Sequence, residues 1–137
     1  MYCYAIQIDI DLVLINIAKA FRLISMAYSE FLADRVRQRL RNAGQVEEKK
    51  MMGGLVFMVN EKMCIGIDTD KKSDQDRLMV RVGKLPYEQL LGQKGSRQMD
   101  FTGRVMRGFL FVDPEGFDLE EDLDYWVERA LEFNRLL

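Results

Sequence analysis

The chain has 137 residues and a formal net charge of −2, which suits one globular domain without a global attraction to nucleic acid or anionic membranes. It contains no histidine, which excludes histidine-activated nucleophiles, histidine metal sites and histidine acid–base catalysis. We therefore expect no enzyme activity, cofactor or metal, although carboxylate, lysine or tyrosine chemistry stays open. The two cysteines, Cys3 and Cys64, have no metal-ligand spacing. We expect both to be reduced and the protein to be cytoplasmic.

Residues 1–25 differ in character from the rest of the chain. Apolar and polar residues alternate over Ile6–Leu12, which predicts a strand, and Leu14–Ile24 predicts an amphipathic helix too interrupted to span a bilayer. Two interpretations stay open: an additional strand and helix, or an extension upstream of a native start at Met26. The intact mass of the natural protein distinguishes them.

The next helix is predicted to begin at Ser29, a favourable N-cap residue, and to end near Gly44. Its buried stripe is Leu32, Val36 and Leu40. Arginines crowd the remaining surface, with Arg35 and Arg39 one turn apart. This face is either a nucleic-acid or acidic-partner surface, or a solvated helix face, and the second interpretation is favoured.

Two strands joined by a tight turn at residues 60–62 are predicted over residues 53–67, after a polar edge strand at 46–52. Because side chains alternate between the two sides of a strand, each strand has one apolar face. On the first strand this face is Leu55, Phe57 and Val59, and on the second it is Met63, Ile65 and Ile67. A hairpin this apolar needs other strands beside it and helices packed against it.

The loop over residues 68–76 contains four aspartates: Asp68, Asp70, Asp74 and Asp76. A calcium site is possible, but the glycine and terminal glutamate of an EF-hand are missing, which favours a solvated loop. In the following strand, residues 77–82, Arg77 and Arg81 share a face with Met79. That face either binds a ligand or is the solvated side of an antiparallel sheet.

A short helix is predicted from Pro86 to Gly92, with Leu85, Leu90 and Leu91 as its anchors. Residues 95–108 are turn-rich, with a short strand expected at 98–101 and a turn at 102–103. Residues 108–112 predict an apolar strand, and residues 113–116 predict a turn. The last helix is predicted from Asp118, in a capping box with Glu121. Capping explains its acidic first turns better than a metal site does. The predicted buried stripe is Leu119, Leu123, Trp126, Val127, Ala130, Leu131 and Phe133.

Several motifs recur in the order typical of one family. They are Met52-Gly53-Gly54-Leu55, Phe57-Met58-Val59-Asn60, Arg77-Leu78-Met79-Val80-Arg81-Val82-Gly83, Met99-Asp100-Phe101-Thr102-Gly103-Arg104, Val112-Asp113-Pro114 and Trp126-Val127. In these the chain, over about residues 26–137, resembles the N-terminal domain of the TfoX/Sxy family of bacterial competence regulators. The resemblance implies a two-layer α+β fold, helix–strands–helix–strands–helix, with an antiparallel sheet. It also implies regulation of transcription and offers no catalytic residues to transfer.

Three functional hypotheses follow. The first is a non-enzymatic regulatory module that binds a protein partner through Arg77, Arg81, Arg104 and Arg107. The second is direct nucleic-acid binding through Arg35 and Arg39, with strong salt dependence. The third is a small-molecule binder or enzyme that uses Asp100, Arg104 and Tyr87, which requires a concave pocket.

Overall fold

The computed structural model describes residues 9–25 and 27–137, with the backbone alone for residues 18–25. The elements in chain order are α1 (Ile10–Ser25), α2 (Glu30–Arg39), β1 (Val46–Met51), β2 (Gly54–Val59), β3 (Lys62–Thr69), β4 (Asp76–Arg81), α3 (Lys84–Leu90), β5 (Ser96–Phe101), β6 (Arg104–Val112), a 3-10 turn (Pro114–Gly116) and α4 (Glu120–Asn134). All strand pairs are antiparallel, and the sheet order is β1-β2-β3-β4-β6-β5. The predicted α+β fold and its element order from α2 onward are therefore confirmed.

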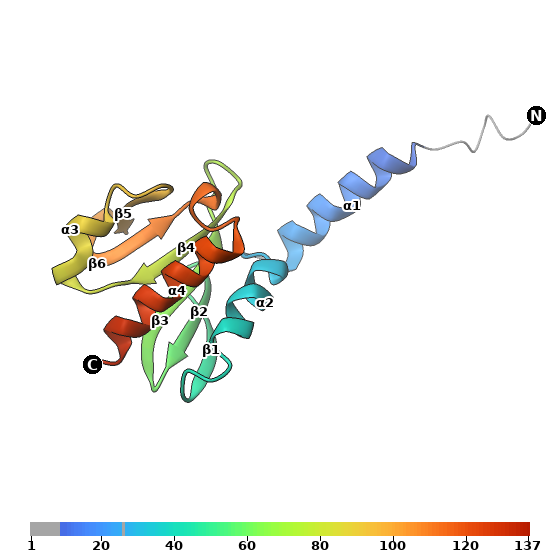
Figure 1. The fold of residues 1–137 in the computed structure, drawn as a ribbon. Helices are drawn as coiled ribbons and strands as arrows, with labels where there is room; N and C mark the ends of the chain where they lie inside the picture. The colour runs from blue at the N-terminus through green and yellow to red at the C-terminus, as the bar shows by residue number, and fades with distance from the viewer. Residues whose placement is uncertain (1–8, 26) are drawn as a thin grey trace, which may run out of the picture.

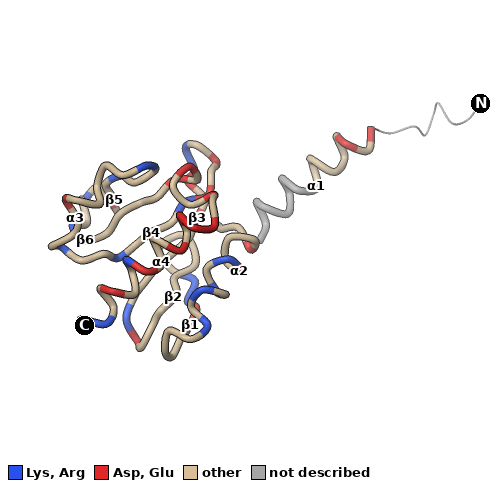
Figure 2. Tube along the Cα trace, in the orientation of Figure 1, with Lys and Arg blue, Asp and Glu red and all other residues tan. Residues whose placement is uncertain are grey.

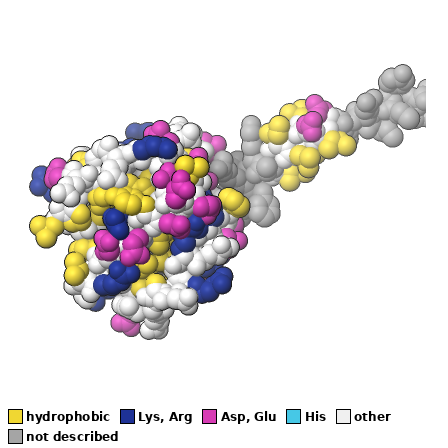
Figure 3. Space-filling model, viewed as in Figure 1, with side chains coloured by type: hydrophobic (Ala, Val, Ile, Leu, Met, Phe, Trp, Pro, Cys, Tyr) yellow, Lys and Arg dark blue, Asp and Glu magenta, His cyan; other side chains and the backbone are white. Residues whose placement is uncertain are grey.

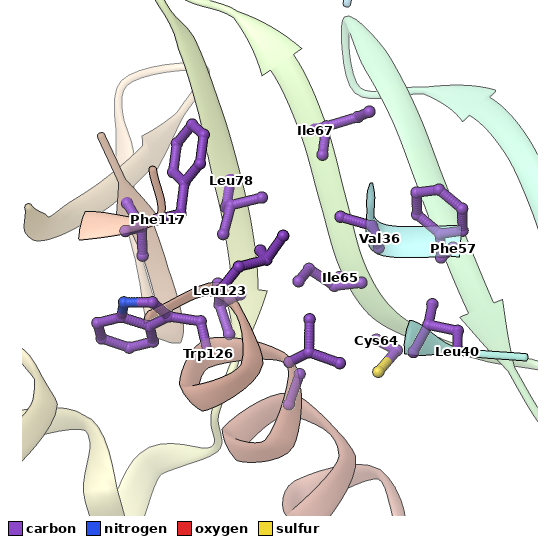
Figure 4. Close-up of a cluster of buried hydrophobic side chains, with 14 of the residues drawn as sticks. Val36, Leu40, Phe57, Cys64, Ile65, Ile67, Leu78, Phe117, Leu123 and Trp126 are labelled. Atoms are coloured by element: carbon purple, nitrogen blue, oxygen red, sulfur yellow. The ribbon is translucent and has the colours of Figure 1, made fainter. Parts of the chain in front are cut away.

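The main hydrophobic core lies between the sheet and the helices α2 and α4 (Figures 1 and 4). The predicted stripe of α2, Leu32, Val36 and Leu40, is at most 2% exposed and meets Phe57 and Ile65 of the central hairpin. Trp126 of α4 is 2% exposed, as a core anchor should be. At the end of α4, the buried side-chain amide of Asn134 donates to the Val59 carbonyl at 3.1 Å, which fixes this helix to β2.

A second hydrophobic cluster lies on the other side of the sheet and corrects the prediction of a solvated face. Val56, Met79, Met99 and Phe111 are each at most 5% exposed. Five partly buried apolar residues surround them: Met52, Met58, Met63, Met106 and Phe109. Flexible methionine side chains fill such irregular space well. The alternation in β4 was correct, but the second face is packed rather than wet.

The N-terminal segment is helical where a strand was predicted. Residues 10–12, the end of the predicted strand, form the first turn of α1, and residues 6–8 lie outside the described part of the chain. The side chain of Asp9 accepts a hydrogen bond from the Leu12 backbone N–H at 3.2 Å, which satisfies one free donor of the helix start. α1 projects away from the rest of the protein (Figure 1). No helix in the described residues is long and apolar enough to cross a membrane.

An irregularity in the central hairpin corrects the predicted faces of β3. Phe57 pairs with Ile65, but Met58 pairs with Met63, so Cys64 is an extra residue between two paired positions. Cys64 is therefore 1% exposed in the main core, whereas Met63 packs against the second cluster. Simple alternation does not anticipate this reversal because a bulge shifts the period by one residue.

The helix ends differ in detail from the predictions. The Ser29 hydroxyl caps α2 as predicted, accepting from the Leu32 N–H at 3.2 Å. That helix, however, ends at Arg39 rather than near Gly44. The capping box predicted for α4 is wrong, because Leu119 is the N-cap and no side chain caps the helix. Leu119 and Leu85, both predicted to be buried, are 53% and 96% exposed.

Candidate functional site

A groove of about 420 Å³ opens where the end of β4, α3, β6 and α4 meet. Its apolar lining includes Pro86, Leu90, Phe109 and Phe133. In the same part of the molecule, Figure 3 shows hydrophobic side chains beside basic ones. We call this feature the α3–α4 groove. Its volume lies within the range of about 300–1,000 Å³ that is common for ligand sites.

Two glycines allow the walls of the α3–α4 groove to approach one another. Gly83 turns the chain from β4 into α3 with φ +84°, and a Cβ added there would lie 2.4 Å from the Phe133 ring. The backbone N–H groups of Val82 and Gly83 both donate to the Gly108 carbonyl, at 2.8 and 3.0 Å. The turn is therefore joined to β6 while Phe133 occupies the space that a side chain would need.

Arg81 is the most constrained cation of the groove. Its guanidinium carbon lies 5.5 Å from the Phe109 ring centroid and 5.4 Å from that of Phe133. One of its N–H groups donates to the Met63 carbonyl at 3.3 Å. Among the described residues, no carboxylate lies within ion-pair distance of Arg81. The charge is thus partly buried and held in position, but not neutralised.

Arg107 and Lys84 add two further positive charges to the lining of the groove. Both residues are exposed, and within the described part of the chain neither forms an ion pair. Arg129 is the fourth cation, and it is partly satisfied: one terminal nitrogen donates to Glu132 at 2.7 Å, and the guanidinium lies 4.7 Å from the Tyr125 ring centroid. Its Nε is buried and has no hydrogen-bond partner among the described residues.

The structure thus brings together two of the four arginines in the predicted interaction surface. Arg81 and Arg107 line the α3–α4 groove, whereas Arg77 and Arg104 do not. The sequence reasoning missed Lys84, Arg129 and Glu132. The i, i+4 spacing of Arg129 and Phe133 placed them on one side of α4, but only the tertiary fold shows that this side faces Arg81.

Arg77 is bound within the protein. Its Nε and one terminal nitrogen donate to the two carboxylate oxygens of Asp68, at 2.8 and 3.1 Å. The guanidinium also lies 3.7 Å from the Phe111 ring centroid, and a further ion pair joins it to Asp70 at 3.5 Å. Backbone hydrogen bonding to Lys72, supported by Arg77 and Arg97, holds the pKa of Asp70 below its ordinary value. The prediction of a solvated loop over residues 68–76 is therefore wrong for Asp68, which is 7% exposed at the end of β3. In the described part of the chain, only the pair with Asp70 joins Arg77 to the loop itself.

Arg35 and Arg39, the predicted nucleic-acid face, connect α2 with the beginning of α4. Arg35 donates to Glu120 at 3.1 Å and to the carbonyls of Phe117 and Asp118 at 3.0 and 3.1 Å. Arg39 pairs with Glu120 and, at 2.5 Å, with Asp124. In Figure 2 basic residues lie along α2, and acidic residues lie at the start of α4. This pairing supplies a structural role for both charge clusters, while nucleic-acid binding stays a prediction.

The three residues of the small-molecule hypothesis lie in different environments, two on the surface and one in the core. Asp100 and Arg104 are exposed near the turn between β5 and β6, and Tyr87 of α3 is 4% exposed in the main core. The structure therefore does not present them as one convergent polar cluster, and that hypothesis stays untested.

The described residues offer neither a metal site nor a reactive thiol. In the described residues, no group of three or more His, Cys, Asp or Glu side chains is arranged to hold a metal ion. Cys64 is a buried free cysteine, and desolvation raises the pKa of its thiol to about 12 despite the opposing field of Arg81. The thiol is thus not suited to act as a nucleophile near neutral pH.

Comparison with known proteins identifies the family. The model of the TfoX N-terminal domain matches residues 38–134, which include the sheet, α3 and all of α4. No curated protein matches the chain. The match contains nearly all of the α3–α4 groove, from Arg81 to Phe133. Since it covers well over half of the chain, this protein belongs to the TfoX N-terminal domain family.

Proposed function

We propose that this protein is a non-enzymatic regulatory module that binds a protein partner through the α3–α4 groove. The observation that carries the proposal is the apolar lining of that groove beside three cations, Arg81, Lys84 and Arg107, which have no carboxylate partner in the described residues. Arg81 is the partly buried one of the three, and it differs from Arg77, because partly buried charges that only stabilise the fold are normally paired, as Arg77 is. Family membership supports a regulatory role, and transcriptional control of competence genes is the form of it that we propose.

The test is site-specific photo-crosslinking in cells of the source organism, with the crosslinker at position 85 on the rim of the groove. The result that supports the proposal is a crosslinked protein, identified by mass spectrometry, that is lost when Arg107→Glu is added. Arg104→Glu is the matched control, because Arg104 is also an exposed arginine of β6 but lies outside the groove. Crosslinks that persist in Arg107→Glu, or no crosslinked protein at all, would overturn the proposal.

A further inference from the structure

We infer that the α3–α4 groove recognises an acidic, apolar peptide segment of the partner, with Arg81 as the anchor for a carboxylate. This inference rests on the proposed function and adds the chemistry of what is bound. It uses three independent features of the site: the charge balance of the groove, the setting of Arg81, and the extent of the apolar surface.

The charge balance of the groove is opposite to that of the chain. The whole protein has a net charge of −2. The groove is lined by four cations, Arg81, Lys84, Arg107 and Arg129, and by the single carboxylate of Glu132. Glu132 is itself paired with Arg129 at 2.7 Å. The positive charge is therefore local, and it complements an acidic segment.

The setting of Arg81 distinguishes it from an ordinary surface arginine. Its guanidinium carbon lies 5.5 Å from the ring centroid of Phe109 and 5.4 Å from that of Phe133, and its hydrogen bond to the Met63 carbonyl fixes its direction. A carboxylate arriving here meets a cation that is already ordered, so little side-chain entropy is lost on binding. The surrounding apolar side chains lower the local dielectric and strengthen such a charge-assisted hydrogen bond.

The apolar surface extends beyond the cavity. Leu85 on α3 and Leu136 after α4 both line the groove and are 96% and 81% exposed. A small anion would cover Arg81 but leave these leucines in water. A peptide that carries aliphatic or aromatic side chains next to its acidic residues would cover both, and the buried apolar area would add to the affinity. The extent of this surface favours a peptide over a free anion.

Selection from a displayed library of random peptides, about twelve residues long, tests the inference on the full chain. We expect the enriched peptides to combine Asp or Glu with Leu, Ile, Phe or Trp. For a synthetic enriched peptide we expect Arg107→Glu to weaken binding by about tenfold or more, and Arg104→Glu to change it less than twofold. Arg81→Glu should have a larger effect, and circular dichroism shows whether it folds. Because Arg107 is exposed, its variant keeps the test decisive if Arg81→Glu does not fold.

Three outcomes would overturn the inference: no enriched sequence, enrichment of basic or uncharged peptides, or affinity that Arg107→Glu leaves unchanged. Two further probes test whether the groove binds another kind of anion instead of an acidic peptide. Inorganic phosphate and vesicles of phosphatidylglycerol should not displace the peptide, and competition by either one would assign the groove to that anion instead. If peptide selection fails while the crosslink at position 85 still depends on Arg107, only the chemistry assigned to the partner is wrong.

Discussion

At the scale of single residues, the arginines of this protein are of two kinds: those with a carboxylate partner and those without one in the described residues. Arg77 has a buried carboxylate beside it, and Arg81 has aromatic rings but no carboxylate among the described residues. The sequence places them at equivalent positions on one strand, four residues apart. The difference arises from the neighbouring strands, because Arg77 is paired in register with Asp68 of β3. It therefore could not be predicted from β4 alone.

The buried ion pair between Arg77 and Asp68 predicts a large loss of stability when Arg77 is replaced by Met. Asp68 is 7% exposed, so Arg77→Met leaves a buried carboxylate without its bidentate partner. We expect the free energy of unfolding to fall by about 2–4 kcal/mol, measured by urea denaturation. Arg135→Met is the control, because its pair with Glu128 is exposed and should contribute less than about 1 kcal/mol. Equal losses in the two variants would contradict the structural role of Arg77.

At the scale of elements, charged pairs join segments that the sequence analysis treated separately. The acidic start of α4 was expected to cap its own helix, but it binds Arg35 and Arg39 of α2 instead. The acidic residues were predicted correctly to lie in the first turns of a helix. The arginines that pair with these acids lie about 80 residues away in the chain. The pattern of a single sequence contains no information on that pairing.

A second pair, between α2 and the edge strand β1, predicts a pH dependence of stability. Arg37 donates to both carboxylate oxygens of Glu48, at 2.6 and 2.7 Å. These hydrogen bonds hold the pKa of the Glu48 carboxyl below its ordinary value of 4.5. Because the folded-state pKa is lowered, the stabilisation is fully present above pH 4.5 and is lost as the pH falls through the folded-state pKa.

We therefore expect Glu48→Gln to reduce the free energy of unfolding by about 0.5–1 kcal/mol at pH 7, a modest value because the pair is partly exposed. The difference between variant and wild type should shrink as the pH is lowered from 6 to 3. Urea denaturation at several pH values measures it. Glu47→Gln, at an exposed neighbouring position without an ion pair in the described residues, should follow the wild-type curve. A difference for Glu48→Gln that is constant with pH would refute this explanation.

At the scale of the whole molecule, periodicity predicted the elements well and the site poorly. The stripe of α2 and the alternation in β2 and β4 follow from burial against one core. The α3–α4 groove, in contrast, is assembled from Arg81, Arg107 and Arg129, which belong to three elements with no common sequence pattern. The bulge at Cys64 and the packed second face of the sheet likewise depend on how strands pair. The groove, the bulge and the packed second face were therefore not predicted, because each depends on contacts between segments that are distant in the sequence.

In the described part of the chain, the packed domain begins just before α2, and this predicts the effect of shortening the chain. Six apolar side chains of α1, at positions 10, 12, 13, 14, 15 and 17, are 38–68% exposed, so they contribute little to the core. The first described residues that contact the domain are Ala27, whose carbonyl accepts from the Thr69 N–H at 2.9 Å, and Tyr28, which is 7% exposed. A chain that starts at Met26 should therefore keep the full stability of the domain, within about 0.5 kcal/mol.

A chain that also lacks Ala27 and Tyr28, with Ser29 directly after its initiating methionine, is the matched comparison. It retains the Ser29 cap of α2 but loses Tyr28 and the hydrogen bond from Thr69 to Ala27. Removal of a buried aromatic side chain should cost about 3 kcal/mol, because its apolar contacts in the core are not replaced. Urea denaturation of the two shortened proteins beside the full chain measures both effects. If the chain from Met26 were destabilised as much as the shorter one, α1 would contribute to the stability of the domain.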